Sequence, residues 1–81
     1  MTKNDTCRVL ILGASGMLGN ALFQLFSQEP NFVAFGSVRS LGSLHLLPEV
    51  LHANVISGVD VENADSLTHL FSTMRPDIVV N

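Results

Sequence analysis

Apolar and polar residues alternate along the chain in blocks that match the periods of strands and helices. The mostly apolar run at 8–12 ends at Gly13, which is typical of a strand buried on both faces. A helix is expected next, because apolar residues recur three and four positions apart and the pattern stops before Pro30. These residues are Leu18, Ala21, Leu22 and Leu25.

The rest of the chain repeats this alternation. Apolar runs of strand length occupy 32–35 and 55–59, and a fourth occupies 77–80. Between the last two runs, Asn63 is in position to cap a helix. The apolar stripe of that helix comprises Leu67, Leu70, Phe71 and Met74.

Two charged residues and one proline indicate where this second helix begins and ends. Asp65 falls in its first turn, where the helix dipole favours a negative charge. Arg75 falls in its last turn, and Pro76 stops it. The segment 41–52 gives no comparable prediction, because Pro48 divides it into two pieces too short for a clear helical pattern.

Strands that alternate with helices predict βαβ units, a parallel sheet and right-handed crossovers. We therefore expect an α/β fold, the first half of a Rossmann-type doubly wound parallel sheet with strand order 3-2-1-4. At 81 residues the chain is one domain or part of one, and no repeat or linker marks a boundary within it.

Composition narrows the classes of partner. The formal net charge is −3 with four basic residues, which argues against nucleic acid and anionic membranes as partners. Apolar residues make up 47% and charged residues 14%, so we expect something to cover part of the surface. A single cysteine, Cys7, excludes an internal disulfide, and no apolar run is long enough to span a membrane. A cytoplasmic protein is expected.

The strongest chemical signal is the pattern G-x-x-G-x-x-G after the first strand. Gly13 would let the chain turn tightly, Gly16 would let a ligand approach the backbone, and Gly19 would let the helix pack on the sheet. Free N–H groups at the start of the helix would then bind a pyrophosphate, with Ser15 adding a hydroxyl. The setting between a buried strand and an amphipathic helix favours dinucleotide binding over a purely structural turn.

The residues after the second strand bear on which dinucleotide binds. An NAD site would place an acidic residue there, but this chain has Gly36, Ser37 and Val38, followed by Arg39 and Ser40. A guanidinium and a hydroxyl suit a 2′-phosphate, so NADP(H) is expected in preference to NAD(H). The alternative is that Arg39 is an ordinary solvated arginine.

Four stretches together resemble a known family. "GASGMLG" after "VLIL", then "VAFGSVRS", "GVDVENADSL" and "RPDIVVN", are similar to landmarks of the extended short-chain dehydrogenase/reductases, most closely the dTDP-4-dehydrorhamnose reductase branch. The likeness spans 7–81, and Met17 and Leu18 of the glycine loop are among its most specific parts. It implies a Rossmann domain joined to a smaller substrate domain. The implied activity is NAD(P)H-dependent reduction of a 4-keto nucleotide sugar, and a homodimer is one oligomeric state that the protein could adopt.

The resemblance also implies roles for single residues. Met17 and Leu18 would belong to the cofactor-binding loop, Asp60 would accept from the adenine amine, and Val61 would cover a face of that ring. Asn81 would lie where the cofactor passes towards the nicotinamide ribose. For Asp60 there is an equally good alternative, that it only begins the turn towards the next helix.

One departure from the family matters most. Its catalytic Tyr-x-x-x-Lys is missing, since the chain contains no tyrosine. We therefore expect 1–81 to be the N-terminal part of an NAD(P)-binding domain, inactive alone, with no catalytic residue of its own. The substrate domain that holds the nucleotide sugar would lie outside it. Two alternatives remain, a non-catalytic regulatory or scaffold subunit of the same fold and a nucleotide-sugar epimerase or dehydratase.

The predicted sheet places the candidate residues together. In a parallel sheet all strand-to-helix turns emerge at one edge, so Gly13, Arg39, Asp60 and Asn81 should share a rim despite their distance in sequence. No metal site is expected, because the three histidines have no ligand-like spacing. We interpret Met17, Met74 and the five phenylalanines as core packing.

Overall fold

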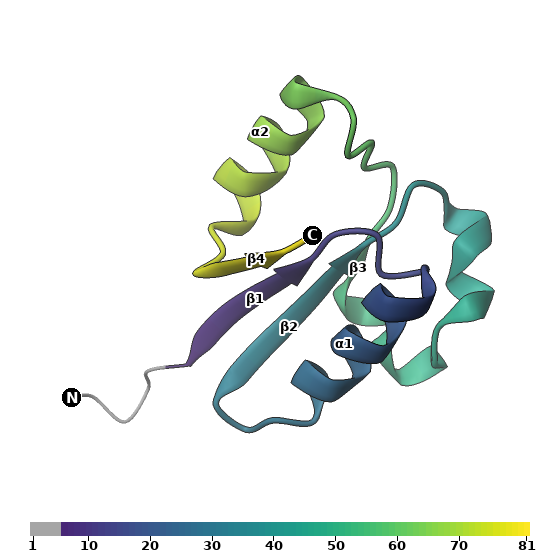
Figure 1. The fold of residues 1–81 in the computed structure, drawn as a ribbon, viewed down its shortest axis with the longest axis vertical. Helices are drawn as coiled ribbons and strands as arrows, with labels where there is room; N and C mark the ends of the chain where they lie inside the picture. The colour runs from purple at the N-terminus through teal and green to yellow at the C-terminus, as the bar shows by residue number, and fades with distance from the viewer. Residues whose placement is uncertain (1–5) are drawn as a thin grey trace.

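Four strands form a single parallel sheet in the order β3-β2-β1-β4 in the computed structural model, which describes residues 6–81 (Figure 1). The strands are β1 (Cys7–Ile11), β2 (Phe32–Ser37), β3 (Val55–Ile56) and β4 (Ile78–Val80). The helices are α1 (Met17–Ser27), α2 (Ala64–Met74) and two short 3-10 helices, η1 (Leu41–Leu46) and η2 (Glu49–Asn54). The predicted fold and strand order are confirmed.

Side chains of β1 alternate between two apolar layers, which explains its continuous apolar run. Val9 and Ile11 are buried together with Phe23 of α1 on one face of the sheet. Leu10 is buried with Leu70 of α2 on the other face. The two helices therefore cover opposite faces of the sheet (Figure 1).

The close approach of α1 to the sheet depends on a glycine in β2. A Cβ atom at Gly36 would lie 2.7 Å from Cβ of Ala14 and 2.9 Å from Cε2 of Phe23. Such contacts are too short for real carbon atoms, so any larger residue would push α1 outward. Gly36 thus fixes how closely Phe23 of α1 and the glycine turn approach β2.

Several element boundaries differ from those predicted, and one segment forms elements for which there was no prediction. The third strand was expected over 55–59 but ends at Ile56, because Gly58 adopts a φ of +78° and turns the chain out of the ladder. The segment around Pro48, for which no element was predicted, forms η1 and η2. Arg75 lies just beyond the last turn of α2, as its C-cap with a φ of +50°.

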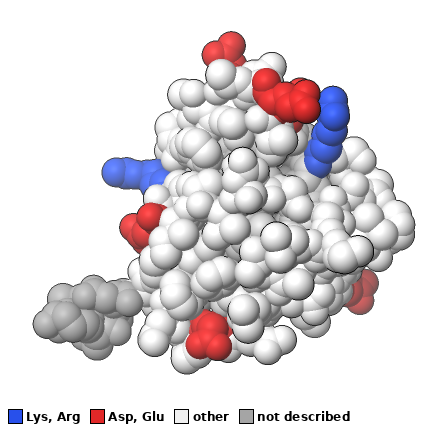
Figure 2. Space-filling model, viewed as in Figure 1, with Lys and Arg blue, Asp and Glu red and all other residues white. Residues whose placement is uncertain are grey.

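Arg8 joins the end of α2 to the first strand. Its Nε and Nη2 atoms donate to the carbonyl oxygen of Met74, at 2.9 Å and 2.6 Å. Its own N–H donates to Oδ2 of Asp77 at 2.8 Å, and its guanidinium lies over the ring of Phe35, 5.0 Å from the centroid. These contacts hold the segment that leads into β4. Charged side chains are sparse and scattered on the face of the molecule seen in Figure 2.

The start of α2 has the cap that its sequence predicts. The side chain of Asn63 accepts a hydrogen bond from the N–H of Ser66 at 3.0 Å, and Asp65 lies in the first turn. Replacing Asn63 with alanine should lower the free energy of unfolding by about 1 kcal/mol, because that N–H loses its acceptor. Urea unfolding measures the change.

Aspartate at the same position is the matched control, because it keeps the acceptor and adds a charge that the helix dipole favours. Asn63→Asp should therefore retain the parental stability. Equal stability of Asn63→Ala and the parent would show that the cap contributes nothing.

Candidate functional site

The chain turns sharply where β1 ends, and the turn is tied to β2. Gly13 adopts a φ of +68°, a conformation that favours glycine. The N–H of Ala14 donates to the carbonyl oxygen of Ser37 at 2.8 Å, and the N–H of Gly13 lies 3.4 Å from the hydroxyl oxygen of the same serine. The tight turn predicted at Gly13 is confirmed, and buried Ser37 holds it in place.

Gly19 lets the first turn of α1 sit directly on this loop. A Cβ atom there would lie 2.3 Å from the carbonyl oxygen of Gly13 and 3.2 Å from Cα of Ala14. The sequence predicted a packing role for Gly19 against the sheet. The structure corrects the partner, which is the backbone of the turn rather than the strands.

Gly16 has no such structural reason. Its φ of −74° and ψ of 168° suit any residue, and an added Cβ would meet only the carbonyl oxygen of Gly13, at an ordinary 3.5 Å. Neither backbone strain nor packing within the chain requires a glycine here. The remaining advantage of glycine is an open approach to the backbone from outside.

The start of α1 presents unpaired donors beside Gly16. No group in residues 6–81 accepts a hydrogen bond from the N–H of Met17, Leu18 or Gly19. Gly16 brings no capping side chain, and the first turn contains no acidic residue that would repel an anion. Such a set of N–H groups at the positive end of a helix suits a phosphate group.

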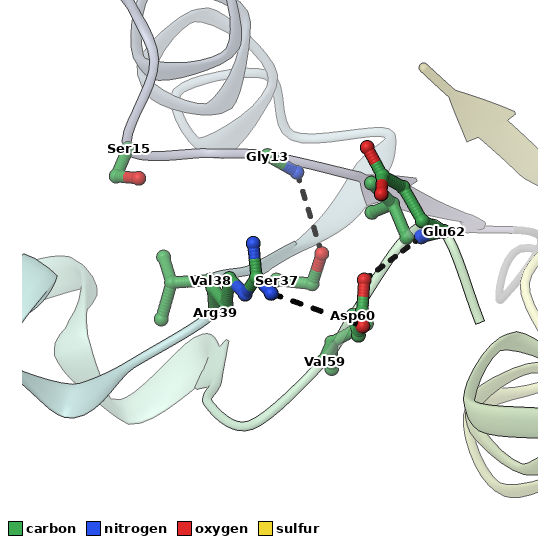
Figure 3. A pocket seen from close by; sticks show the side chains of 9 residues that line it. Gly13, Ser15, Ser37, Val38, Arg39, Val59, Asp60 and Glu62 are labelled. Atoms are coloured by element: carbon green, nitrogen blue, oxygen red, sulfur yellow. Dashed lines mark hydrogen bonds and ion pairs between the residues drawn. The ribbon is translucent and has the colours of Figure 1, made fainter.

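A cavity of about 140 Å³ lies on the β2 side of the turn (Figure 3). It brings together five of the predicted site residues, Gly13, Ser15, Arg39, Asp60 and Val61. They come from the ends of β1 and β2 and from the segment after β3. The expectation of a shared rim at the carboxyl edge of the sheet is therefore confirmed for Gly13, Arg39 and Asp60.

Arg39 and Asp60 face each other across this cavity (Figure 3). Nη2 of Arg39 lies 4.0 Å from Oδ2 of Asp60, and the two side chains are 79% and 41% exposed. The other oxygen of Asp60, Oδ1, accepts from the N–H of Glu62 at 3.0 Å. Asp60 thus does begin the turn towards α2, while its second oxygen remains directed at the cavity.

A second cavity, of about 230 Å³, lies on the β4 side of the same turn. Gly13, Gly16, Leu18, Gly19 and Asn81 line it together with apolar residues of β1, α1 and β4. Gly13 borders both cavities. The glycine turn therefore separates two hollows, an arrangement that matches a ligand with two halves joined at a pyrophosphate.

Two of the predicted site residues line neither cavity. Ser40 is exposed and precedes η1, and Met17 is the first residue of α1 with 94% of its surface exposed. The interpretation of Met17 as core packing was wrong, because its side chain at the start of α1 lies in solvent. As cofactor-binding residues, both remain predictions.

Sequence reasoning also missed residues of the site. Ser37 was noted only for the carboxylate that it replaces, yet its hydroxyl and carbonyl hold the glycine turn. A lone serine at the buried end of a strand is the signal that could have found it. Glu62 lines the first cavity and carries a second negative charge, which its place two residues after Asp60 could have indicated.

Two of the three histidines, His45 and His52, bond to nearby carbonyl groups. His45 contacts Gly42 through Nδ1, and Nε2 of His52 lies 2.8 Å and 3.0 Å from the carbonyl oxygens of Leu44 and Leu47. Over the described range 6–81, no three potential ligands gather as a metal site would require. No helix in that same range is long and apolar enough to cross a membrane.

Comparison with known proteins identifies a family for this chain. Neither the curated proteins nor the solved structures gave a match. A family model described as the NAD dependent epimerase/dehydratase family matches residues 9–81, which include every residue that lines the two cavities. The chain therefore belongs to the NAD dependent epimerase/dehydratase family, and a nicotinamide dinucleotide is the cofactor that this membership implies.

Proposed function

We propose that the chain is the cofactor-binding half of an NADPH-dependent reductase that acts on a 4-keto nucleotide sugar, similar to dTDP-4-dehydrorhamnose reductase. One observation carries the cofactor part of the proposal: Arg39 lines the same cavity as the glycine turn. No carboxylate stands at the end of β2, where Ser37 is buried beneath the turn. A guanidinium there supplies the donors that a 2′-phosphate needs.

The residues present fit a dinucleotide. Gly16 leaves the backbone open, and the N–H groups of Met17, Leu18 and Gly19 are free to hold the pyrophosphate. Asp60 and Val61 would contact the adenine in the first cavity, and Asn81 would contact the other half in the second. The bound nicotinamide supplies hydride chemistry, while these residues bind and orient the cofactor.

The chemical step needs further residues. These 81 residues contain no tyrosine, so a Tyr-x-x-x-Lys acid would have to come from sequence outside them. We propose that the same outside sequence forms the pocket for the nucleotide sugar. The chain itself would then supply cofactor binding only.

Arg39 offers the direct test of the cofactor. Replacing it with alanine in the full-length protein should weaken NADPH binding about tenfold, because a charge-assisted contact from a largely exposed side chain is lost. NADH lacks the 2′-phosphate, so its dissociation constant should barely change. Calorimetric titration with each dinucleotide gives both values.

Salt is the internal control for this measurement, because an exposed ion pair weakens as ionic strength rises. The preference for NADPH should shrink accordingly. An equal loss for both dinucleotides would instead assign Arg39 to the structure of the loop. No change for either would mean that the arginine is solvated.

The family match favours a second candidate, a nucleotide-sugar epimerase or dehydratase that uses the same first half. Such an enzyme restores its cofactor in each cycle, whereas a reductase consumes one NADPH for each sugar reduced. Measuring NADPH consumption against product formed in the full-length protein separates the two. Stoichiometric oxidation supports the reductase, and turnover without net oxidation supports the second candidate.

A further inference from the structure

The charges around the first cavity are not those of a simple phosphate site. Arg39 is the one basic side chain among its lining residues, whereas Asp60 and Glu62 are both acidic (Figure 3). One guanidinium therefore shares this cavity with two carboxylates. A 2′-phosphate would bring further negative charge into the same small space, and like charges in proximity disfavour binding.

Asp60 is the carboxylate best placed to interfere. Its Oδ1 is fixed by the N–H of Glu62 at 3.0 Å, which directs Oδ2 towards Nη2 of Arg39. The distance of 4.0 Å allows attraction but is too long for a hydrogen bond. Arg39 is thus drawn towards Asp60 without being locked there, and both side chains are exposed enough for the pair to exchange partners readily.

We propose that Asp60 is a specificity-determining residue that competes with the 2′-phosphate for Arg39 and so limits the preference for NADPH over NADH. The inference rests on the proposed function, in which Arg39 recognises that phosphate. To bind it, the guanidinium must turn away from Asp60, and the freed carboxylate then faces a dianion. NADH lacks the phosphate and leaves the pair of Arg39 and Asp60 intact.

The test is Asp60→Asn in the full-length protein. Asparagine keeps an oxygen that can accept from the N–H of Glu62, so the turn into α2 is preserved while the charge is removed. The ratio of NADH to NADPH dissociation constants, measured by calorimetry at low ionic strength, should rise about two- to fivefold. At high salt the variant and the parent should converge.

Two further variants show whether the effect passes through Arg39. In an Arg39→Ala background, adding Asp60→Asn should raise the ratio clearly less than it does in the parent, because only the direct repulsion between Asp60 and the phosphate is then removed. Glu62→Gln is the matched control: it removes a carboxylate from the same cavity that forms no ion pair with Arg39. Its effect on the ratio should be clearly smaller than that of Asp60→Asn.

Several outcomes would overturn the inference. A ratio that stays constant or falls in Asp60→Asn excludes competition, and an equal rise in Glu62→Gln assigns the effect to general charge. If Arg39→Ala lowers the ratio while Asp60→Asn leaves it unchanged, this inference fails and the proposed function stands. If Arg39→Ala itself leaves the ratio unchanged, the proposed function fails and the inference fails with it.

Discussion

Replacing Gly16 with valine should abolish dinucleotide binding and leave the protein folded. The valine side chain would project where the pyrophosphate must approach the N–H groups of Met17 and Leu18. Losing two charge-assisted hydrogen bonds, at about 1.5–3 kcal/mol each, lowers affinity by at least about 100-fold. Calorimetry with NADPH and NADH measures the loss, and circular dichroism measures the fold.

Gly19→Ala is the matched comparison, because it alters the same loop for a different reason. Its Cβ would lie 2.3 Å from the carbonyl oxygen of Gly13, so α1 must shift outward. We expect it to lower stability by about 1–3 kcal/mol as well as to weaken binding. Unchanged cofactor affinity in a folded Gly16→Val protein would reject the proposed pyrophosphate site.

Phe23→Ala should be the most destabilising single substitution in the described core. The ring is fully buried between α1 and the sheet, where it packs with Val9 and Ile11 and lies against the glycine of β2. Truncation removes this burial and leaves a cavity, which costs about 3–5 kcal/mol. Urea or thermal unfolding of the full-length protein measures the change.

Leu25→Ala in the same helix provides the control. Its side chain is 53% exposed, so the loss should stay below about 1 kcal/mol. Comparable losses for the two variants would mean that α1 does not dock through Phe23.

Much of the fold could be predicted because it depends on local patterns. The buried run before Gly13 and the helical spacing after it identify β1 and α1, and Asn63 marks the start of α2. The two 3-10 helices could not be predicted in this way, since such short elements leave no periodic pattern. The early end of β3 also escaped prediction, because an apolar run does not reveal the positive φ at Gly58.

The candidate site likewise contains residues that could be predicted from the sequence and residues that could not. Gly13, Arg39 and Asp60 could be placed at one edge because a parallel sheet collects its turns there. The role of Ser37 and the need for Gly36 could not be predicted, because both depend on how closely α1 approaches β2. Met17 was misjudged because spacing along a helix does not show whether the rest of the fold covers its first residue.

The central position of β1 also has a consequence for the order of folding. Val9 pairs with Ala34 of β2 on one side and with Ile78 of β4 on the other. The pairing of β1 with β4 closes a longer loop of chain than the pairing of β1 with β2, so it costs more chain entropy. We therefore expect β4 to dock after β1, α1 and β2 have formed a unit. The second cavity is then completed last, when β4 adds its wall. The N–H groups at the start of α1 are in place earlier.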